Sequence, residues 1–121
     1  MSTFLILIVE DDRDFDDSLV DVAEIEGFDV LLAKTACESY ALAADKTISL
    51  AFIDIKLKDS DGITVARELR ELQPGMDIIY MTGYTREKIQ SDYGLPPESR
   101  ILYKPFKIDQ FISIIHSLKK Q

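Results

Sequence analysis

The sequence predicts an α/β domain built on a five-stranded parallel sheet with helices on both faces. Five short apolar runs occur along the chain, at residues 4–9, 28–33, 50–53, 77–81 and 101–103. Between them lie segments in which apolar residues recur at about one helical turn. The first run, FLILIV, is apolar throughout, which is typical of a strand buried on both faces in a parallel sheet. Strands that alternate with helices in this way predict a (βα)5 order.

Each predicted helix follows one of these apolar runs. The residues spaced by about one turn are Leu19, Val22 and Ile25 or Glu26; Ile63, Ala66 and Leu69; and Ile108, Phe111, Ile112 and Ile115. Residues 36–46 are rich in good helix formers, and Gly27 stands where the first helix is expected to end. The segment 85–94 gives the weakest helical signal, because it is short and polar and has only Ile89 and Tyr93 as an apolar pair.

The composition is that of one globular domain, which we place at residues 1–121, since 46% of the residues are hydrophobic and 30% are charged. The net charge of −8 argues against direct binding of nucleic acid, whose phosphates are bound by clustered Lys and Arg. The N-terminal apolar run is too short for a signal peptide or a membrane span, so no membrane partner is expected. The single cysteine, Cys37, excludes an internal disulfide, fits a cytoplasmic location and is expected to be buried or half-buried on a helix.

Charged and polar residues follow four of the five predicted strands. Glu10 and Asp11 follow the first apolar run, Asp54 the third, Thr82 the fourth and Lys104 the fifth. In an open parallel sheet the carboxyl ends of the strands lie at one edge, and ligand sites form outside that edge. We therefore expect these side chains to share one pocket.

Three carboxylates in one pocket would repel each other and raise one another's pKa. A hard divalent cation removes that repulsion, and Mg²⁺ favours one or two carboxylates together with water and phosphate. A carboxylate beside such an ion can act as a nucleophile toward phosphorus. Phosphoryl transfer also needs groups that bind the phosphoryl oxygens, which Lys104, Thr82 and the backbone N–H of Gly83 would supply.

These residues carry a resemblance to a known family, the response-regulator receiver domains. The motifs that match in order and spacing are Glu10-Asp11, Asp54 with Asp61-Gly62 after it, Thr82-Gly83 and Lys104-Pro105-Phe106. The resemblance covers the whole chain and implies a flavodoxin-like sheet with the strand order 2-1-3-4-5. It also implies a signalling domain, not an enzyme with a separate substrate, that catalyses its own phosphorylation and dephosphorylation. The MTGY and LYKPF segments are similar to those of receivers fused to hybrid sensor histidine kinases.

The resemblance assigns a role to each site residue, with Asp54 as the phosphoacceptor. The metal, Mg²⁺ with Mn²⁺ as an alternative, would be held by Glu10, Asp11, Asp54 and the backbone carbonyl of Lys56. The phosphoryl group would be contacted by Thr82 and Lys104 and bordered by Ile55, Lys56 and Gly83. The implied donor is a sensor histidine kinase or a histidine phosphotransfer protein, and the switched surface would engage an effector domain or a second copy of the chain.

Two positions depart from the usual pattern of the family. Lys58 stands where most members have proline, so the loop after Asp54 should be less pre-ordered. Ile101 stands where many members carry an aromatic switch residue, so we expect phosphorylation to act mainly on residues 83–94. The resemblance further implies a cis peptide bond between Lys104 and Pro105.

Three alternatives use parts of the same pattern. An FMN-binding flavodoxin would share the fold, but the acidic Glu10 and Asp11 would repel the phosphate that its first loop must bind. An aspartyl-phosphate hydrolase would place a second carboxylate two residues after the nucleophile, where this chain has Lys56. A receiver that serves only as a docking module would not need the complete set of carboxylates, hydroxyl and lysine.

Overall fold

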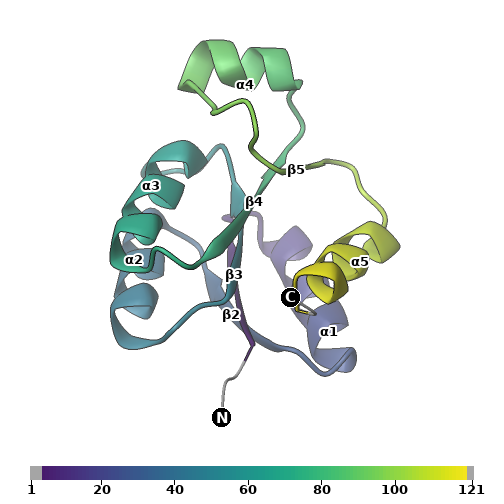
Figure 1. Cartoon of the computed structure of the whole chain (residues 1–121). Helices are drawn as coiled ribbons and strands as arrows, with labels where there is room; N and C mark the ends of the chain where they lie inside the picture. Colours follow the sequence, from purple (N-terminus) through teal and green to yellow (C-terminus); the bar gives the residue numbers. More distant parts are fainter. Residues whose placement is uncertain (1–3, 120–121) are drawn as a thin grey trace.

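The structure, a computed structural model, describes residues 4–119 except for the side chains of residues 13–17, and shows five strands alternating with five helices (Figure 1). The strands are β1 (Leu5–Val9), β2 (Asp29–Ala33), β3 (Leu50–Asp54), β4 (Asp77–Thr82) and β5 (Ile101–Tyr103). The helices are α1 (Arg13–Ile25), α2 (Ala36–Asp45), α3 (Gly62–Leu72), α4 (Arg86–Tyr93) and α5 (Ile108–Lys119). The predicted order of elements is thus confirmed, and the weak helical signal at residues 85–94 corresponds to a real helix.

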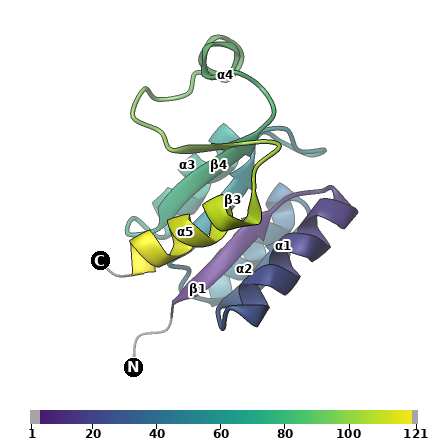
Figure 2. The same ribbon diagram turned by 90° about the vertical axis from the view of Figure 1, so that its right-hand side faces the viewer.

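The five strands form one parallel sheet in the order β2-β1-β3-β4-β5, as predicted. Helices α1 and α5 cover one face, and α2 and α3 cover the other (Figures 1 and 2). Helix α4 stands off from the sheet in both views. Because helices cover both faces of the sheet, an apolar core is needed on each face.

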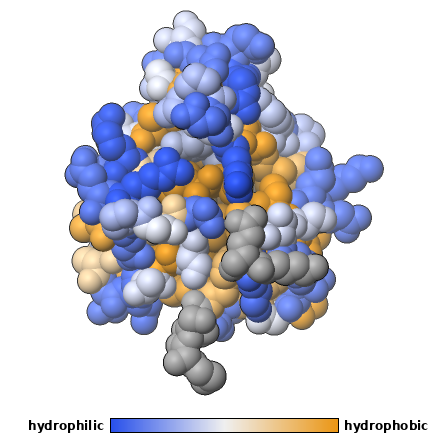
Figure 3. Space-filling view, in the orientation of Figure 1, coloured by the Kyte–Doolittle hydropathy of each residue, from blue (hydrophilic) through white to orange (hydrophobic). Residues whose placement is uncertain are grey.

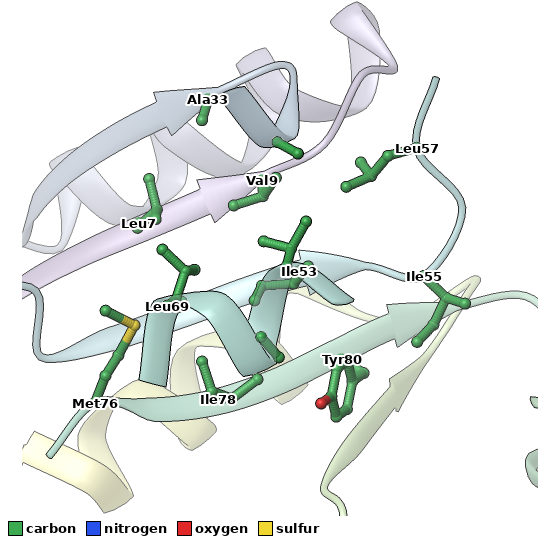
Figure 4. Close-up of a cluster of buried hydrophobic side chains, with 14 of the residues drawn as sticks. Leu7, Val9, Ala33, Ile53, Ile55, Leu57, Leu69, Met76, Ile78 and Tyr80 are labelled. Atoms are coloured by element: carbon green, nitrogen blue, oxygen red, sulfur yellow. The ribbon is translucent and has the colours of Figure 1, made fainter. Parts of the chain in front are cut away.

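Two clusters of buried side chains fill the spaces between the sheet and its helices. The cluster beneath α2 and α3 includes Leu7, Val9 and Ile53 from the strands and Leu69 from α3 (Figure 4). The cluster beneath α1 and α5 includes Phe52 of β3 and Phe111 of α5, whose ring centroids lie 4.7 Å apart. Since neighbouring residues of β1 point into opposite clusters, the whole apolar run is buried, as its sequence predicts.

Local signals in the sequence define several helix ends. Thr35 and Asp61 cap the N-termini of α2 and α3, each accepting a hydrogen bond from the backbone N–H three residues further on. Gly27 follows α1 with a φ of 90°, and Gly94 follows α4 with a φ of 70°, a backbone conformation that favours glycine. The glycine predicted to end the first helix is thereby confirmed.

Two further expectations have opposite outcomes. The Lys104–Pro105 peptide bond is cis, as the resemblance implied. The expectation for Cys37 is wrong, because this residue is exposed in the first turn of α2, whose apolar face turns Ala36 and Ser39 inward instead. Across residues 4–119, no helix has the length and apolar character that a membrane span requires.

Candidate functional site

The carboxyl ends of the strands bring the predicted site residues to one edge of the sheet. Glu10 follows β1, Asp54 ends β3, Thr82 ends β4 and Lys104 follows β5. The register places Asp54 beside Met81, one residue before Thr82, and places Thr82 beside Tyr103, one residue before Lys104. Neighbouring strands thus deliver two carboxylates, a hydroxyl and an ammonium to the same edge.

Glu10 is the most deeply buried charged side chain of this pocket, with 1% of the residue exposed. Its Oε1 accepts hydrogen bonds from the backbone N–H groups of Asp11 and Asp12, at 3.1 and 3.2 Å. Its Oε2 accepts one from the Lys104 ammonium at 2.5 Å. Loss of solvation on burial, together with a hydrogen bond to Asp54, raises the pKa of Glu10 to about 7, although Lys104 acts in the opposite direction.

Asp54 lies beside this pair with 12% of its side chain exposed. Its Oδ2 lies 3.3 Å from the Lys104 Nζ, and its Oδ1 lies 3.4 Å from the backbone nitrogen of Lys56. Burial alone would lower the pKa of Lys104, but the hydrogen bond to Glu10 and the charge of Asp54 outweigh it and raise that pKa. The ammonium therefore stays charged between two carboxylates.

Three carboxylates of the pocket are close enough to hold one metal ion. Glu10, Asp11 and Asp54 each offer an oxygen, and these oxygens lie within 4.8 Å of one another. An all-oxygen, anionic donor set that opens toward solvent at Asp11 fits a hard divalent cation such as Mg²⁺. The carboxylates that sequence reasoning grouped together are indeed brought together.

Thr82 and Gly83 border the pocket on the side of β4. The Thr82 Oγ1 accepts a hydrogen bond from the backbone N–H of Tyr84 at 3.0 Å, and its carbonyl accepts one from the backbone N–H of Lys104 at 2.7 Å. Thr82 is buried, whereas Gly83 is exposed, and a Cβ at Gly83 would meet no atom within 4 Å. Open space therefore lies over the backbone at this point.

The loop after Asp54 is held by contacts that the sequence does not show. The backbone N–H of Ile55 donates to the Met81 carbonyl at 3.1 Å, and the Ile55 carbonyl accepts from the Gly62 N–H at 2.7 Å. A Cβ at Gly62 would lie only 2.4 Å from the Asp54 carbonyl oxygen, so any other residue would force the backbone to shift there. A bridge between Lys56 and Asp61 closes the loop, and the Lys56 side chain is exposed.

Asp59, in the loop that follows Asp54, joins this loop to α2. Its two carboxylate oxygens accept hydrogen bonds from the backbone N–H groups of Ala36 and Cys37, at 3.0 and 3.3 Å. These bonds, with that to Ala36 as the largest cause, lower the pKa of Asp59. A carboxylate that caps a helix 22 residues away leaves no local signal, so the sequence alone could not reveal it.

Comparisons with known proteins agree with this geometry. The family model described as "Response regulator receiver domain" matches residues 6–116. The response regulator receiver protein CpdR of Brucella abortus is 29% identical over 113 residues, which cover 93% of this chain and 94% of CpdR. The aerobic respiration control protein ArcA of Escherichia coli is 37% identical over 87 residues, which cover 72% of this chain but only 36% of ArcA.

Solved structures agree as well. A CheY-like response regulator receiver domain protein from Methanospirillum hungatei superposes with a TM-score of 0.81 and 32% identity, over 98% of this chain and 96% of that one. A two-component response regulator from Clostridium difficile, at 23% identity, shares the fold with a TM-score of 0.88. With its parallel sheet and acidic edge, this chain belongs to the response-regulator receiver domains of two-component signalling.

Proposed function

We propose that this receiver domain takes a phosphoryl group from a phosphohistidine donor onto Asp54 and thereby switches a protein-interaction surface. The observation that carries the proposal is the position of the Asp54 carboxylate, which lies within a cluster of three carboxylates and 3.3 Å from the Lys104 ammonium. A nucleophilic carboxylate, cationic groups and an open approach are what phosphoryl transfer to Asp requires.

In the transfer, an Asp54 oxygen forms a bond to phosphorus while the bond from phosphorus to the donor imidazole nitrogen breaks. The electron pair leaves with that nitrogen. Lys104, already charged beside Asp54, would bind a phosphoryl oxygen, and the Thr82 hydroxyl would bind another after releasing the Tyr84 N–H. In hydrolysis of the acyl phosphate, a water oxygen would bond to phosphorus while the bond from phosphorus to the Asp54 oxygen breaks, which releases inorganic phosphate and returns the free carboxylate. The same groups would assist this step, so the domain would catalyse its own dephosphorylation.

Backbone groups would complete the phosphoryl site. Gly83 has no side chain and open space where a Cβ would be, so we expect its N–H to be accessible to a phosphoryl oxygen, and the Lys56 N–H already points at Asp54 Oδ1. The Ile55 N–H is engaged by the Met81 carbonyl, so a phosphoryl contact from Ile55 would require this bond to open.

Mg²⁺, or Mn²⁺ in its place, would be held by Glu10, Asp11, Asp54 and the carbonyl of Lys56, where it would neutralise charge on the carboxylates and the phosphoryl oxygens. Binding of such an ion also favours the ionised form of Glu10, whose pKa burial raises.

The proposed donor is a sensor histidine kinase or a histidine phosphotransfer protein, acting in the cytoplasm. The proposed target of the switched surface is an effector domain or a second copy of the chain, without direct contact to nucleic acid, in keeping with a net charge of −8. We place the receiver at residues 1–121.

Intact mass measurement after incubation with acetyl phosphate and Mg²⁺ tests the proposal. We expect one added phosphoryl group in the wild type and none in Asp54→Asn. The control variant is Asp29→Asn, which removes an exposed carboxylate on β2 and should be labelled like the wild type. Equal labelling of Asp54→Asn would contradict the assignment of Asp54. A folded wild type that stays unlabelled with acetyl phosphate and with a phosphorylated histidine donor would favour the alternative of a pure docking module.

A further inference from the structure

A recess lies between α3 and the segment that follows α4, away from the carboxylate cluster. Its volume is about 420 Å³, within the range of small-molecule sites. Its lining includes Ile63, Arg67, Arg70, Glu71, Tyr80 and Pro96. In Figure 3, hydrophobic surface is visible between α4 and the body of the domain, with hydrophilic residues around it.

Tyr80 places a buried polar group at the floor of this recess. Only 3% of the residue is exposed, and its ring packs at the edge of the cluster beneath α2 and α3 (Figure 4). Among the groups that the structure describes, which leave out the side chains of residues 13–17, its hydroxyl has no hydrogen-bond partner. Because buried hydroxyl groups are almost always hydrogen-bonded, to protein or to water, this hydroxyl is available to bond to a group that enters the recess.

Two arginines of α3 line the same recess. Arg67 and Arg70 are three residues apart and therefore lie on one side of the helix. Neither guanidinium has an ion pair or a hydrogen bond to any residue that the structure describes, although the chain has 22 acidic and only 14 basic residues. Glu71 is the one acidic residue in the lining, and it leaves both unpaired. The lining thus carries two guanidinium groups and one carboxylate, an excess of one positive charge, although the charge of Asp61 also acts on Tyr80.

The chemistry of these groups points to one class of ligand. A guanidinium binds a carboxylate or a phosphate through two parallel N–H bonds. A phenol can donate its O–H to the same anionic group. Ile63 and Pro96 offer apolar walls to the rest of a small molecule. We propose that the recess binds a small organic anion, with its carboxylate or phosphate held by Arg70, Arg67 and the Tyr80 hydroxyl and its apolar part against Ile63 and Pro96.

Such a ligand would connect two elements that otherwise have few contacts. Gly94, the C-terminal cap of α4, and Pro96 lie on one side of the recess, and α3 lies on the other. Helix α4 itself buries only Ile89 among residues 86–93. A bound anion would therefore restrain the end of α4 and give the domain an input that is separate from phosphorylation.

NMR titration of the full chain in Mg²⁺-free buffer tests the inference, with benzoate, phenyl phosphate and inorganic phosphate as probes. We expect amide shifts at residues 67–71 and 94–100, with tighter binding of the two organic anions than of inorganic phosphate. The preference between benzoate and phenyl phosphate identifies the anionic group. Arg70→Gln should weaken binding roughly 10- to 100-fold, since it removes a charge-assisted hydrogen bond.

Variants separate this site from the phosphorylation site and from a fold defect. Tyr80→Phe should weaken binding about tenfold without lowering the melting temperature of the free protein, because its hydroxyl has no partner to lose. Lys46→Gln, at an exposed cation after α2, and Asp54→Asn should leave the affinity unchanged. Shifts confined to residues 54, 82–83 and 104, unchanged affinity in Arg70→Gln, or no shifts at millimolar probe would each overturn the proposal.

Discussion

The Lys104 ammonium lies closer to Glu10, at 2.5 Å, than to Asp54, at 3.3 Å, so a residue after β5 is paired first with a residue after β1. This pair joins positions 94 residues apart in the sequence. One ammonium cannot compensate two buried carboxylates in full, because removal from water disfavours each charge. Glu10 is the carboxylate whose ionised form is disfavoured, and its pKa is raised to about 7.

The raised pKa of Glu10 predicts how stability depends on pH in metal-free buffer. Between pH 4.5 and pH 7 the folded protein keeps a proton on Glu10 that the unfolded chain has lost, so stability falls as pH rises. The shift corresponds to about 3 kcal/mol across this window. Glu10→Gln has no proton to lose, so the free energy of unfolding of the wild type, relative to this variant, should fall from pH 4.5 to 7. A difference that stays constant in urea denaturation would contradict the buried, crowded state of Glu10.

Metal binding should relieve the same crowding. A ligand at about 100 times its Kd that binds only the folded state stabilises it by about 2.7 kcal/mol. We therefore expect Mg²⁺ to raise the melting temperature of the wild type, and Asp11→Ala to lose this shift while being no less stable than the wild type without metal. Asp29→Ala, which removes an exposed carboxylate from β2, should keep the shift. If Asp11→Ala is clearly less stable than the wild type in metal-free buffer, mutual repulsion does not describe this pocket.

The close approach at Gly62 makes a steric prediction. A Cβ there would lie 2.4 Å from the Asp54 carbonyl oxygen and 2.9 Å from the Ile55 Cα, both backbone atoms that cannot turn aside. Gly62→Ala should cost about 1–3 kcal/mol of stability in urea denaturation and also slow phosphorylation, because Asp54 must shift. Gly75→Ala, where a Cβ meets no atom within 4 Å, is the matched control and should change stability little. Equal stability of the two variants would show that the loop after Asp54 can shift to make room for a Cβ with little loss of stability.

The link between Asp59 and α2 should be visible as a pH-dependent contribution. Since the pKa of Asp59 is lowered in the folded state, its stabilisation is present above the ordinary value of 3.8 and is lost as pH falls through the folded-state pKa. Asp59→Ala should lower the melting temperature at pH 7, by an amount that shrinks in acid. Asp21→Ala, at an exposed position of α1, should not show this pattern. If Asp59→Ala lowers the melting temperature by the same amount at all pH values, the result would argue against a cap made by the Asp59 carboxylate.

The fold could be predicted from the sequence because the signals for strands and turns lie within a few neighbouring residues of the chain. The run at residues 4–9 identifies a doubly covered strand, and β1 is buried as expected. The gathering of the candidate site residues could be predicted as well, since parallel strands necessarily present residues such as Asp54 and Lys104 at one edge. The shared edge follows from strand order and direction, not from the conformation of any side chain.

The remaining features depend on tertiary contacts that leave no periodic signal. The capping of α2 by Asp59, the space that Gly62 keeps free and the unpaired arginines near Tyr80 are set by how the loops and α3 pack. The exposure of Cys37 was missed for a related reason. A small residue in the first turn of a helix can face either way, and only the packing of α2 decides.

Phosphorylation should act mainly on the segment that follows β4. The Thr82 Oγ1 holds the Tyr84 N–H at 3.0 Å, so a Thr82 hydroxyl that turned to a phosphoryl group would release the start of residues 83–94. Ile89 is the only buried residue of α4, and sparsely anchored segments open at low cost. Arg86 ties α4 to the carbonyls of Pro97 and Ser99, each at 3.1 Å, so the change should extend to residue 99.

Hydrogen exchange with and without beryllofluoride, in the presence of Mg²⁺, measures this response. We expect protection changes at residues 83–99 and little change around Ile101, whose short aliphatic side chain is half-buried and has no ring to turn inward. Arg86→Gln should confine the change to residues 83–94, because the following loop is then no longer hydrogen-bonded to α4. Lys88→Gln on the same helix keeps the Arg86 hydrogen bonds, so the change should still extend to residue 99. Protection changes restricted to residues 101–118 would place the switch in β5 and α5, and would show that the weak anchoring of α4 is not what phosphorylation uses.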